Sequence, residues 1–209
     1  MWNRVLFALC FLAIAWSVTP EAVAQKPRMA FDTGSTMWRG ERIELPPGFA
    51  PDMQWKGTED IRFAPGMFQA DADDFFTYVL VFLLEKDSDV SLQAIQREIL
   101  TYYRGLSKAV SKGKVSPADA GKFTVEMNQE SEVTLNPPGI QKEGVTGYSG
   151  KLDWIEPFAS QKPQTLHFEA QLWKHGEQPA LFLCVSPQKR EAKIWESLRK
   201  IRSTFRIED

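Results

Sequence analysis

Apolar and polar positions change their spacing several times along the chain, and these changes predict its strands and helices. Alternation with a period of two predicts short strands over 41–45 and 60–64, each followed by a turn signal that contains Pro and Gly. The run FFTYVLVFLL at 75–84 is apolar throughout and rich in β-branched and aromatic residues. Such a run is typical of a central strand that is buried on both faces.

A helical spacing follows this run. From Ser91 onward, apolar and aromatic residues recur at intervals of three and four, which predicts an amphipathic helix of about twenty residues. Ser91 is a suitable N-cap, and Gly113 with Pro117 suits the exit. Tyr102 and Tyr103 fall on the apolar face, so we expect both in the core.

The chain then returns to strand-like patterns. Five further strands are predicted, over 123–127, 132–135, 146–155, 165–173 and 179–186. Alternation in the fourth places His167, Glu169 and Gln171 on the outward side, which favours an antiparallel meander with one solvated face. Apolar residues at helical intervals predict a last helix over 188–204, lying on the sheet.

Strands, a helix, a run of strands and a closing helix indicate an α+β fold. We expect a single domain over 41–209, in which a long central helix and a C-terminal helix pack on a mainly antiparallel sheet. Residues 25–40 are polar and without a sustained period, so they are expected to form a flexible N-terminal arm.

The first residues indicate export. Arg4 precedes twelve unbroken apolar residues at 5–16, and Ala22-Val23-Ala24 provides small residues for cleavage before Gln25. This pattern predicts a signal peptide over 1–24. Twelve residues are too few to cross a bilayer core of about 30 Å as a helix. We therefore expect a periplasmic or secreted protein without stable membrane insertion after cleavage.

The layout from the export signal to the closing segment IRSTF at 201–205 resembles the PsbP and Mog1 type of α/β/α sandwich, found in many small exported bacterial proteins. The segments GERIELPPGF at 40–49 and RFAPGMF at 62–68 also resemble an uncharacterised secreted bacterial family. These resemblances imply a fold and a location; neither supplies catalytic residues.

Charge and cysteine content narrow the possible partners. The chain has 25 Lys and Arg against 27 Asp and Glu, and removing residues 1–24 takes away Arg4 and Glu21, so the net charge stays at −2. A near-neutral chain has no long-range field to attract nucleic acid. Cys184 is then the only cysteine, so no intramolecular disulfide is expected.

The sharpest motif is Asp32-Thr33-Gly34, which resembles the Asp-Thr-Gly loop of aspartic peptidases. That chemistry needs two carboxylates that share a proton. No second such triplet occurs, and little chain precedes the motif for supporting strands. A polar turn is the favoured interpretation, and a hydrolase using Asp32 is the alternative.

Three further groups could carry chemistry. Asp71, Asp73 and Asp74 form an acidic cluster, but Phe75 and Phe76 stand where a calcium-binding EF-hand loop needs an oxygen ligand and a glycine. We expect a solvated turn there.

His167 and His175 make a weak zinc pair. Cys184 could act as a nucleophile with His167 only if their strands are adjacent, and its apolar neighbours favour a buried, inert thiol. No catalytic, cofactor-binding or metal-ligating residue is therefore assigned.

Aromatic residues near turns and strand ends remain as possible binding residues: Trp38, Trp55, Phe68, Phe75, Trp154, Phe158 and Trp173. A well-formed core pattern without a catalytic set favours a non-enzymatic exported domain that binds a small molecule or an envelope protein. Besides the hydrolase, a subunit of an envelope assembly is an alternative, and it predicts a large apolar patch on the surface.

Overall fold

The computed structural model describes residues 27–133, 138, 140 and 144–208. The predicted signal peptide lies outside these residues. Within the described part of the chain, no helix is long and apolar enough to span a membrane.

The elements follow the predicted order of strands, helix, strands and helix. The strands are β1 (Arg28–Ala30), β2 (Arg39–Leu45), β3 (Gly57–Phe63), β4 (Tyr78–Leu84), β5 (Thr124–Gln129), β6 (Thr146–Ile155), β7 (Pro163–His175), β8 (Gln178–Ser186) and β9 (Arg206–Glu208). The helices are α1 (Leu92–Val110), α2 (Pro117–Ala120) and α3 (Ile194–Thr204).

Seven strands form one antiparallel sheet in the order β2-β3-β4-β8-β7-β6-β5, and β1 pairs with β9 in a small second sheet. The prediction of an α+β domain with a mainly antiparallel sheet is confirmed. Every residue of β4 is buried, as the apolar run predicts. Its alternate side chains enter two separate cores, Leu80 and Phe82 on one face and Val79 and Val81 on the other.

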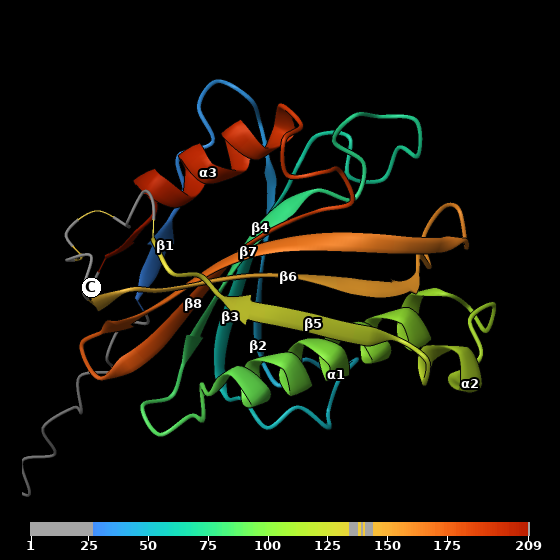
Figure 1. The fold of residues 1–209 in the computed structure, drawn as a ribbon, viewed down its shortest axis with the longest axis horizontal. Helices are drawn as coiled ribbons and strands as arrows, with labels where there is room; N and C mark the ends of the chain where they lie inside the picture. Colours follow the sequence, from blue (N-terminus) through green and yellow to red (C-terminus); the bar gives the residue numbers. More distant parts are fainter. Residues whose placement is uncertain (1–26, 134–137, 139, 141–143, 209) are drawn as a thin grey trace, which may run out of the picture.

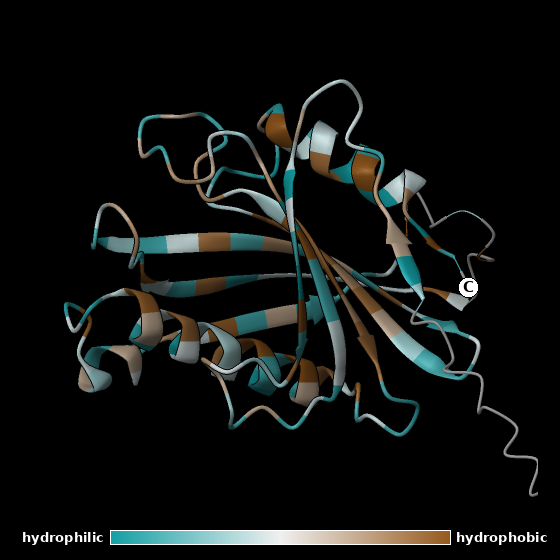
Figure 2. Cartoon of the chain, turned by 180° about the vertical axis from the view of Figure 1, so that it is seen from behind, coloured by the Kyte–Doolittle hydropathy of each residue, from teal (hydrophilic) through white to brown (hydrophobic). Residues whose placement is uncertain are grey.

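Helices cover both faces of the sheet. Helices α1 and α2 lie on one face, and α3 lies on the other beside β1 (Figure 1). Hydrophobic residues follow the central strands and recur along the helices (Figure 2). The prediction of one solvated face is therefore wrong for the central strands. Glu169 and Gln171, expected to point outward, are buried.

The segment predicted as a flexible N-terminal arm is partly ordered. Residues 28–30 form β1, and β2 begins at Arg39, two residues before the predicted domain boundary. Met29 is buried, and the Phe31 ring lies 4.9 Å from that of Phe205. Part of the predicted arm thus packs against the C-terminal end of the chain, because its alternate residues Met29 and Phe31 are apolar.

Three predicted boundaries also shift. The strand predicted over 75–84 begins at Tyr78, because Phe76 has a positive φ of 48° and its N–H donates to the carbonyl oxygen of Met67 across the preceding loop. The helix predicted over 188–204 begins at Ile194 after a series of turns. For the strand predicted over 132–135, residues 132 and 133 are not in a strand, and 134 and 135 lie outside the described residues.

Candidate functional site

A pocket of about 420 Å³ lies on the α1 face of the sheet, over its β2–β3 side. Its size falls within the range of small-molecule pockets, roughly 300–1,000 Å³. The lining is mainly apolar: Ile43, Ile61, Met67, Leu106, Phe49, Phe63, Phe68, Phe76 and Phe158. Few polar side chains line it: Arg39, Glu41, Glu59, Tyr78 and Tyr102.

Local sequence explains how one wall of the pocket forms. Gly105 lies on α1 where an added Cβ would collide with the carbonyl oxygen of Phe49. The missing side chain lets the loop after β2 approach the helix closely. Phe49 can then pack edge-on against Tyr102, with ring centroids 5.0 Å apart.

Glu59 is the unusual member of the lining. It lies on β3 and alternates with Ile61 and Phe63, so the strand directs its carboxyl to the apolar α1 face. The residue is fully buried, with 0% exposure. The Tyr102 hydroxyl donates a hydrogen bond of 2.8 Å to Oε1, whereas Oε2 has no hydrogen-bond partner.

Other buried acidic side chains in the described part of the chain have partners on both oxygens. Asp60 is held by Arg42 and Arg62. Glu98 accepts hydrogen bonds from the Gln54 N–H and from Arg97.

Glu156 has the same satisfied pattern: both of its oxygens accept from backbone N–H groups of residues 158–160. Since an unpaired buried polar atom is costly, the free oxygen of Glu59 distinguishes it from these structural carboxylates.

Burial changes the acidity of this group. Burial raises the pKa of Glu59 to about 7, the hydrogen bond from Tyr102 opposes the rise, and the charges of Glu41 and Asp60 add to it. Burial also raises the pKa of Tyr78 and that of Tyr102 well above 10, so both phenols stay protonated. At neutral pH the pocket therefore holds a carboxyl that exchanges its proton readily, beside phenols that do not.

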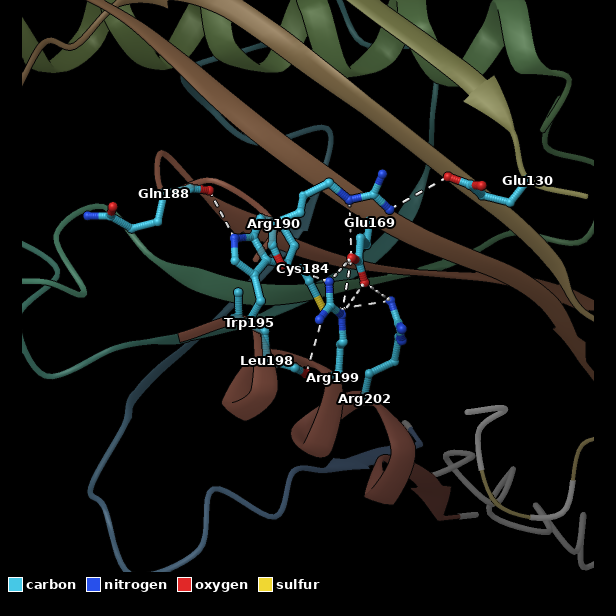
Figure 3. Close-up of polar contacts among 9 residues, drawn as sticks. All are labelled: Glu130, Glu169, Cys184, Gln188, Arg190, Trp195, Leu198, Arg199 and Arg202. Atoms are coloured by element: carbon cyan, nitrogen blue, oxygen red, sulfur yellow. Dashed lines mark hydrogen bonds and ion pairs between the residues drawn. The ribbon is translucent and has the colours of Figure 1, made fainter. Parts of the chain in front are cut away.

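A second charged cluster lies on the opposite face of the sheet, between β7 and α3 (Figure 3). Glu169 receives Arg199 Nη2 at 2.6 Å, Arg202 Nη1 at 3.2 Å and Arg190 Nε at 3.2 Å. Arg190 also approaches Glu130, with Nη2 and Oε1 3.6 Å apart. The cluster fastens α3 and the segment before it to the sheet.

The three guanidinium groups outweigh the cost of burying this carboxylate. Burial raises the pKa of Glu169. The hydrogen bond from Arg199 and the charges of Arg202, Arg199 and Arg190 together lower it by more, so the pKa lies below its ordinary value. Both carboxylate oxygens are used. Glu169 thus behaves as a structural ion, unlike Glu59.

Asp32 of the peptidase-like motif lies in an exposed turn. Its Oδ1 accepts a hydrogen bond of 2.9 Å from the Gly34 N–H, which closes an Asx turn. This geometry explains the Asp-Thr-Gly sequence locally.

In the acidic cluster, Asp71 and Asp73 are exposed, and Asp74 accepts from the Gly66 N–H. Among the described residues, no group of three or more His, Cys, Asp or Glu side chains could hold a metal.

The cysteine–histidine pair is not assembled. Strands β7 and β8 are adjacent, but their register pairs His167 with Ser186 and Cys184 with Glu169. Cys184 is fully buried beneath α3, where its Sγ lies 3.5 Å from the carbonyl oxygen of Leu198. Burial raises its thiol pKa to about 12, so the thiol is protonated and unreactive at neutral pH.

The aromatic candidates divide into two groups. Trp55, Phe75, Trp154 and Trp173 are buried, and Trp38 packs on the core beneath α3. Phe68 and Phe158 line the pocket, with ring centroids 5.8 Å apart.

Phe68 is 56% exposed and Met37 is 86% exposed, and these are the exposed large hydrophobic residues of the described chain. They do not amount to the broad apolar patch that an envelope-assembly subunit predicts.

Sequence reasoning missed the central residue of this site. The predicted strand begins at Asp60, one residue after Glu59, so the prediction does not place this carboxyl among apolar neighbours. The signal was available, because Glu59, Ile61 and Phe63 share one face of an alternating strand. A charged residue on such a face is a site candidate when no basic residue lies beside it.

No protein-family model matches the sequence, and the comparison with curated proteins finds no match. Among solved structures, the chain is similar to the cyanobacterial PsbP protein CyanoP from Synechocystis sp.. The alignment covers 83% of this chain and 95% of that chain, with 12% identity and a TM-score of 0.33.

Proposed function

We propose that the protein is an exported, non-enzymatic binding domain whose pocket at Glu59 takes a small, mainly apolar molecule. The observation that carries the proposal is the combination of an aromatic-lined pocket of about 420 Å³ and a buried carboxyl oxygen without a partner. Apolar surface provides affinity in such pockets, and a few placed polar groups fix orientation.

The charged cluster at Glu169 is a weaker candidate. Its adjoining cavity, of about 340 Å³, is lined by Arg190, Arg199 and Arg202, whose charges are engaged by carboxylates of the same cavity. A ligand there would have to compete with ion pairs already formed, whereas Oε2 of Glu59 has no such competitor.

Occupation of the pocket can be tested with neutral aromatic probes. Benzyl alcohol and indole, titrated separately into the protein, should shift backbone amide NMR signals of β3, α1 and residues 64–76. Leu106→Trp should abolish these shifts, because it adds volume at a half-buried position of the lining. Leu100→Trp, at a half-buried position of the same helix outside the lining, is the matched control and should retain them.

The proposal fails if neither probe binds, or if Leu106→Trp leaves the shifts unchanged. A folded spectrum for each variant makes the comparison valid. Equal loss in both variants would also count against this pocket, because it would locate the effect in the helix rather than in the lining.

Export rests on the first 24 residues. Expression of the full chain in a bacterial host should yield a periplasmic or secreted protein whose N-terminal residue, read by mass spectrometry, is Gln25. A full-length protein retained in the cytoplasm would contradict this part of the proposal.

A further inference from the structure

The hydrogen bonding of Glu59 indicates which chemical group a ligand should present to it. Its Oε1 is occupied by the Tyr102 hydroxyl, and Oε2 is buried without a partner. The hydroxyl of Tyr78, the other phenol of the lining, is already bonded to that of Tyr103. When Glu59 is ionised, its carboxylate accepts hydrogen bonds only, so the partner that Oε2 then lacks is a donor.

The charges around Glu59 favour a positive donor. Glu41 lines the same pocket and adds a second carboxylate. Asp60, the neighbour of Glu59 in β3, is neutralised by Arg42 and Arg62. Within the lining, Arg39 is the basic residue, and it is exposed on the edge strand β2.

Aromatic rings strengthen the same preference. Five phenylalanines line the pocket, Phe49, Phe63, Phe68, Phe76 and Phe158. Aromatic faces attract cations, most strongly where water is excluded. Apolar rings around a single carboxylate are thus suited to an ammonium group attached to an apolar body.

We propose that the ligand of this pocket is an organic amine, an N–H-bearing ammonium group on an apolar or aromatic body, with Glu59 as its counter-ion. This inference rests on the proposed binding function and names the ligand class for the same pocket. The ammonium donates to Oε2, and the apolar body occupies the phenylalanine-lined space.

The pH dependence of binding follows from the groups that face Glu59. Its pKa of about 7 is set by burial, by the hydrogen bond from Tyr102, and by Glu41 and Asp60. A bound cation favours the ionised form, so binding releases a proton whenever Glu59 starts protonated. Affinity for an amine should therefore rise from acidic pH to about pH 8, roughly tenfold or more.

Benzylamine and benzyl alcohol provide a matched pair of probes for calorimetry. At about pH 8, the protonated amine should bind about tenfold more tightly than the alcohol, and its affinity should fall about tenfold at about pH 5.5. Titrations in buffers of different ionisation enthalpy should reveal proton release from the native protein near neutral pH. This measurement needs no variant.

Variants then assign the effect to one carboxyl. Glu59→Gln, which keeps the shape and the acceptor for Tyr102, should reduce the preference for the amine to about twofold or less and remove its pH dependence. Glu126→Gln, which removes an exposed carboxylate outside the lining, is the control and should keep both.

Three outcomes would overturn the inference. Benzyl alcohol binding as tightly as benzylamine refutes the amine class while the proposed binding function stands. Binding that tightens toward acidic pH indicates a neutral acceptor ligand held by protonated Glu59, and also refutes it. Binding of neither compound refutes the inference together with the function on which it rests.

Discussion

Glu59 and Glu169 are buried glutamates on opposite faces of the same sheet, and their surroundings differ in every respect that matters for function. Glu169 lies among three guanidinium groups, uses both oxygens and has a lowered pKa. Glu59 lies among aromatic rings, uses one oxygen and has a pKa raised to about 7. The first is held as an ion by the fold itself, and the second is not.

This difference shows why burial alone does not identify a functional carboxyl. A buried charge with complete partners contributes to positioning, here the placement of α3, and removal of one partner is costly. A buried carboxyl with an unused oxygen beside a cavity costs stability unless something binds it. The contrast therefore separates a structural from a functional role by the balance of hydrogen bonds.

The largest predicted effect is a loss of stability when Glu169 is replaced. Glu169→Gln should lower the free energy of unfolding by about 3–5 kcal/mol at neutral pH, because it leaves the Arg202 guanidinium, only 4% exposed, without its counter-charge. Urea denaturation followed by tryptophan fluorescence measures this change. A loss below about 1 kcal/mol would show that the arginine cluster does not anchor α3.

The second prediction is a gain in the free energy of unfolding when Glu59 is replaced. Glu59 has a folded-state pKa of about 7 against an ordinary value of 4.5, so the folded protein binds this proton more tightly than the unfolded chain does. Stability is therefore lost as pH rises from 4.5 through 7, by about 3 kcal/mol in total.

Glu59→Gln should remove this loss and stabilise the protein by about 3 kcal/mol near pH 8. Urea denaturation of both proteins over a pH series provides the comparison, with Glu126→Gln, an exposed position outside the pocket, as the control. Destabilisation by Glu59→Gln at pH 8 would mean that the ionised carboxylate has a partner in the fold, which would break the contrast with Glu169.

The smallest effect is expected at the rim of the arginine cluster. Glu130 and Arg190 are each more than a third exposed, and their charged atoms lie 3.6 Å apart. Glu130→Gln should change the free energy of unfolding by less than about 1 kcal/mol, as exposed ion pairs usually do. A change as large as that of Glu169→Gln would make the whole cluster, rather than its buried centre, the anchor of α3.

Much of the fold follows from periodicity. The helical spacing after Ser91 corresponds to α1, and the apolar run at 75–84 contains β4, because its short length and its β-branched and aromatic residues favour a strand over a buried helix. Helix α3 begins later than predicted. The carbonyl of Gln188 accepts the Trp195 indole N–H, and the turn between these residues replaces the first helical turns.

The candidate site was harder to predict for a physical reason. Alternation in β7 assigns Glu169 to a polar face, but a polar face meets either solvent or a layer of opposite charge, and only the placement of α3 decides between them. For Glu59 the alternation in β3 indicates an apolar face, but the sequence does not show that one of its carboxyl oxygens lacks a hydrogen-bond partner.

The most direct test of the central claim is a carboxyl carbon-13 NMR titration of Glu59, assigned by comparison with Glu59→Gln. The account predicts a midpoint near pH 7 in the free protein, moving to lower pH when benzylamine is present. A midpoint near the ordinary value of 4.5, unchanged by benzylamine, would contradict it.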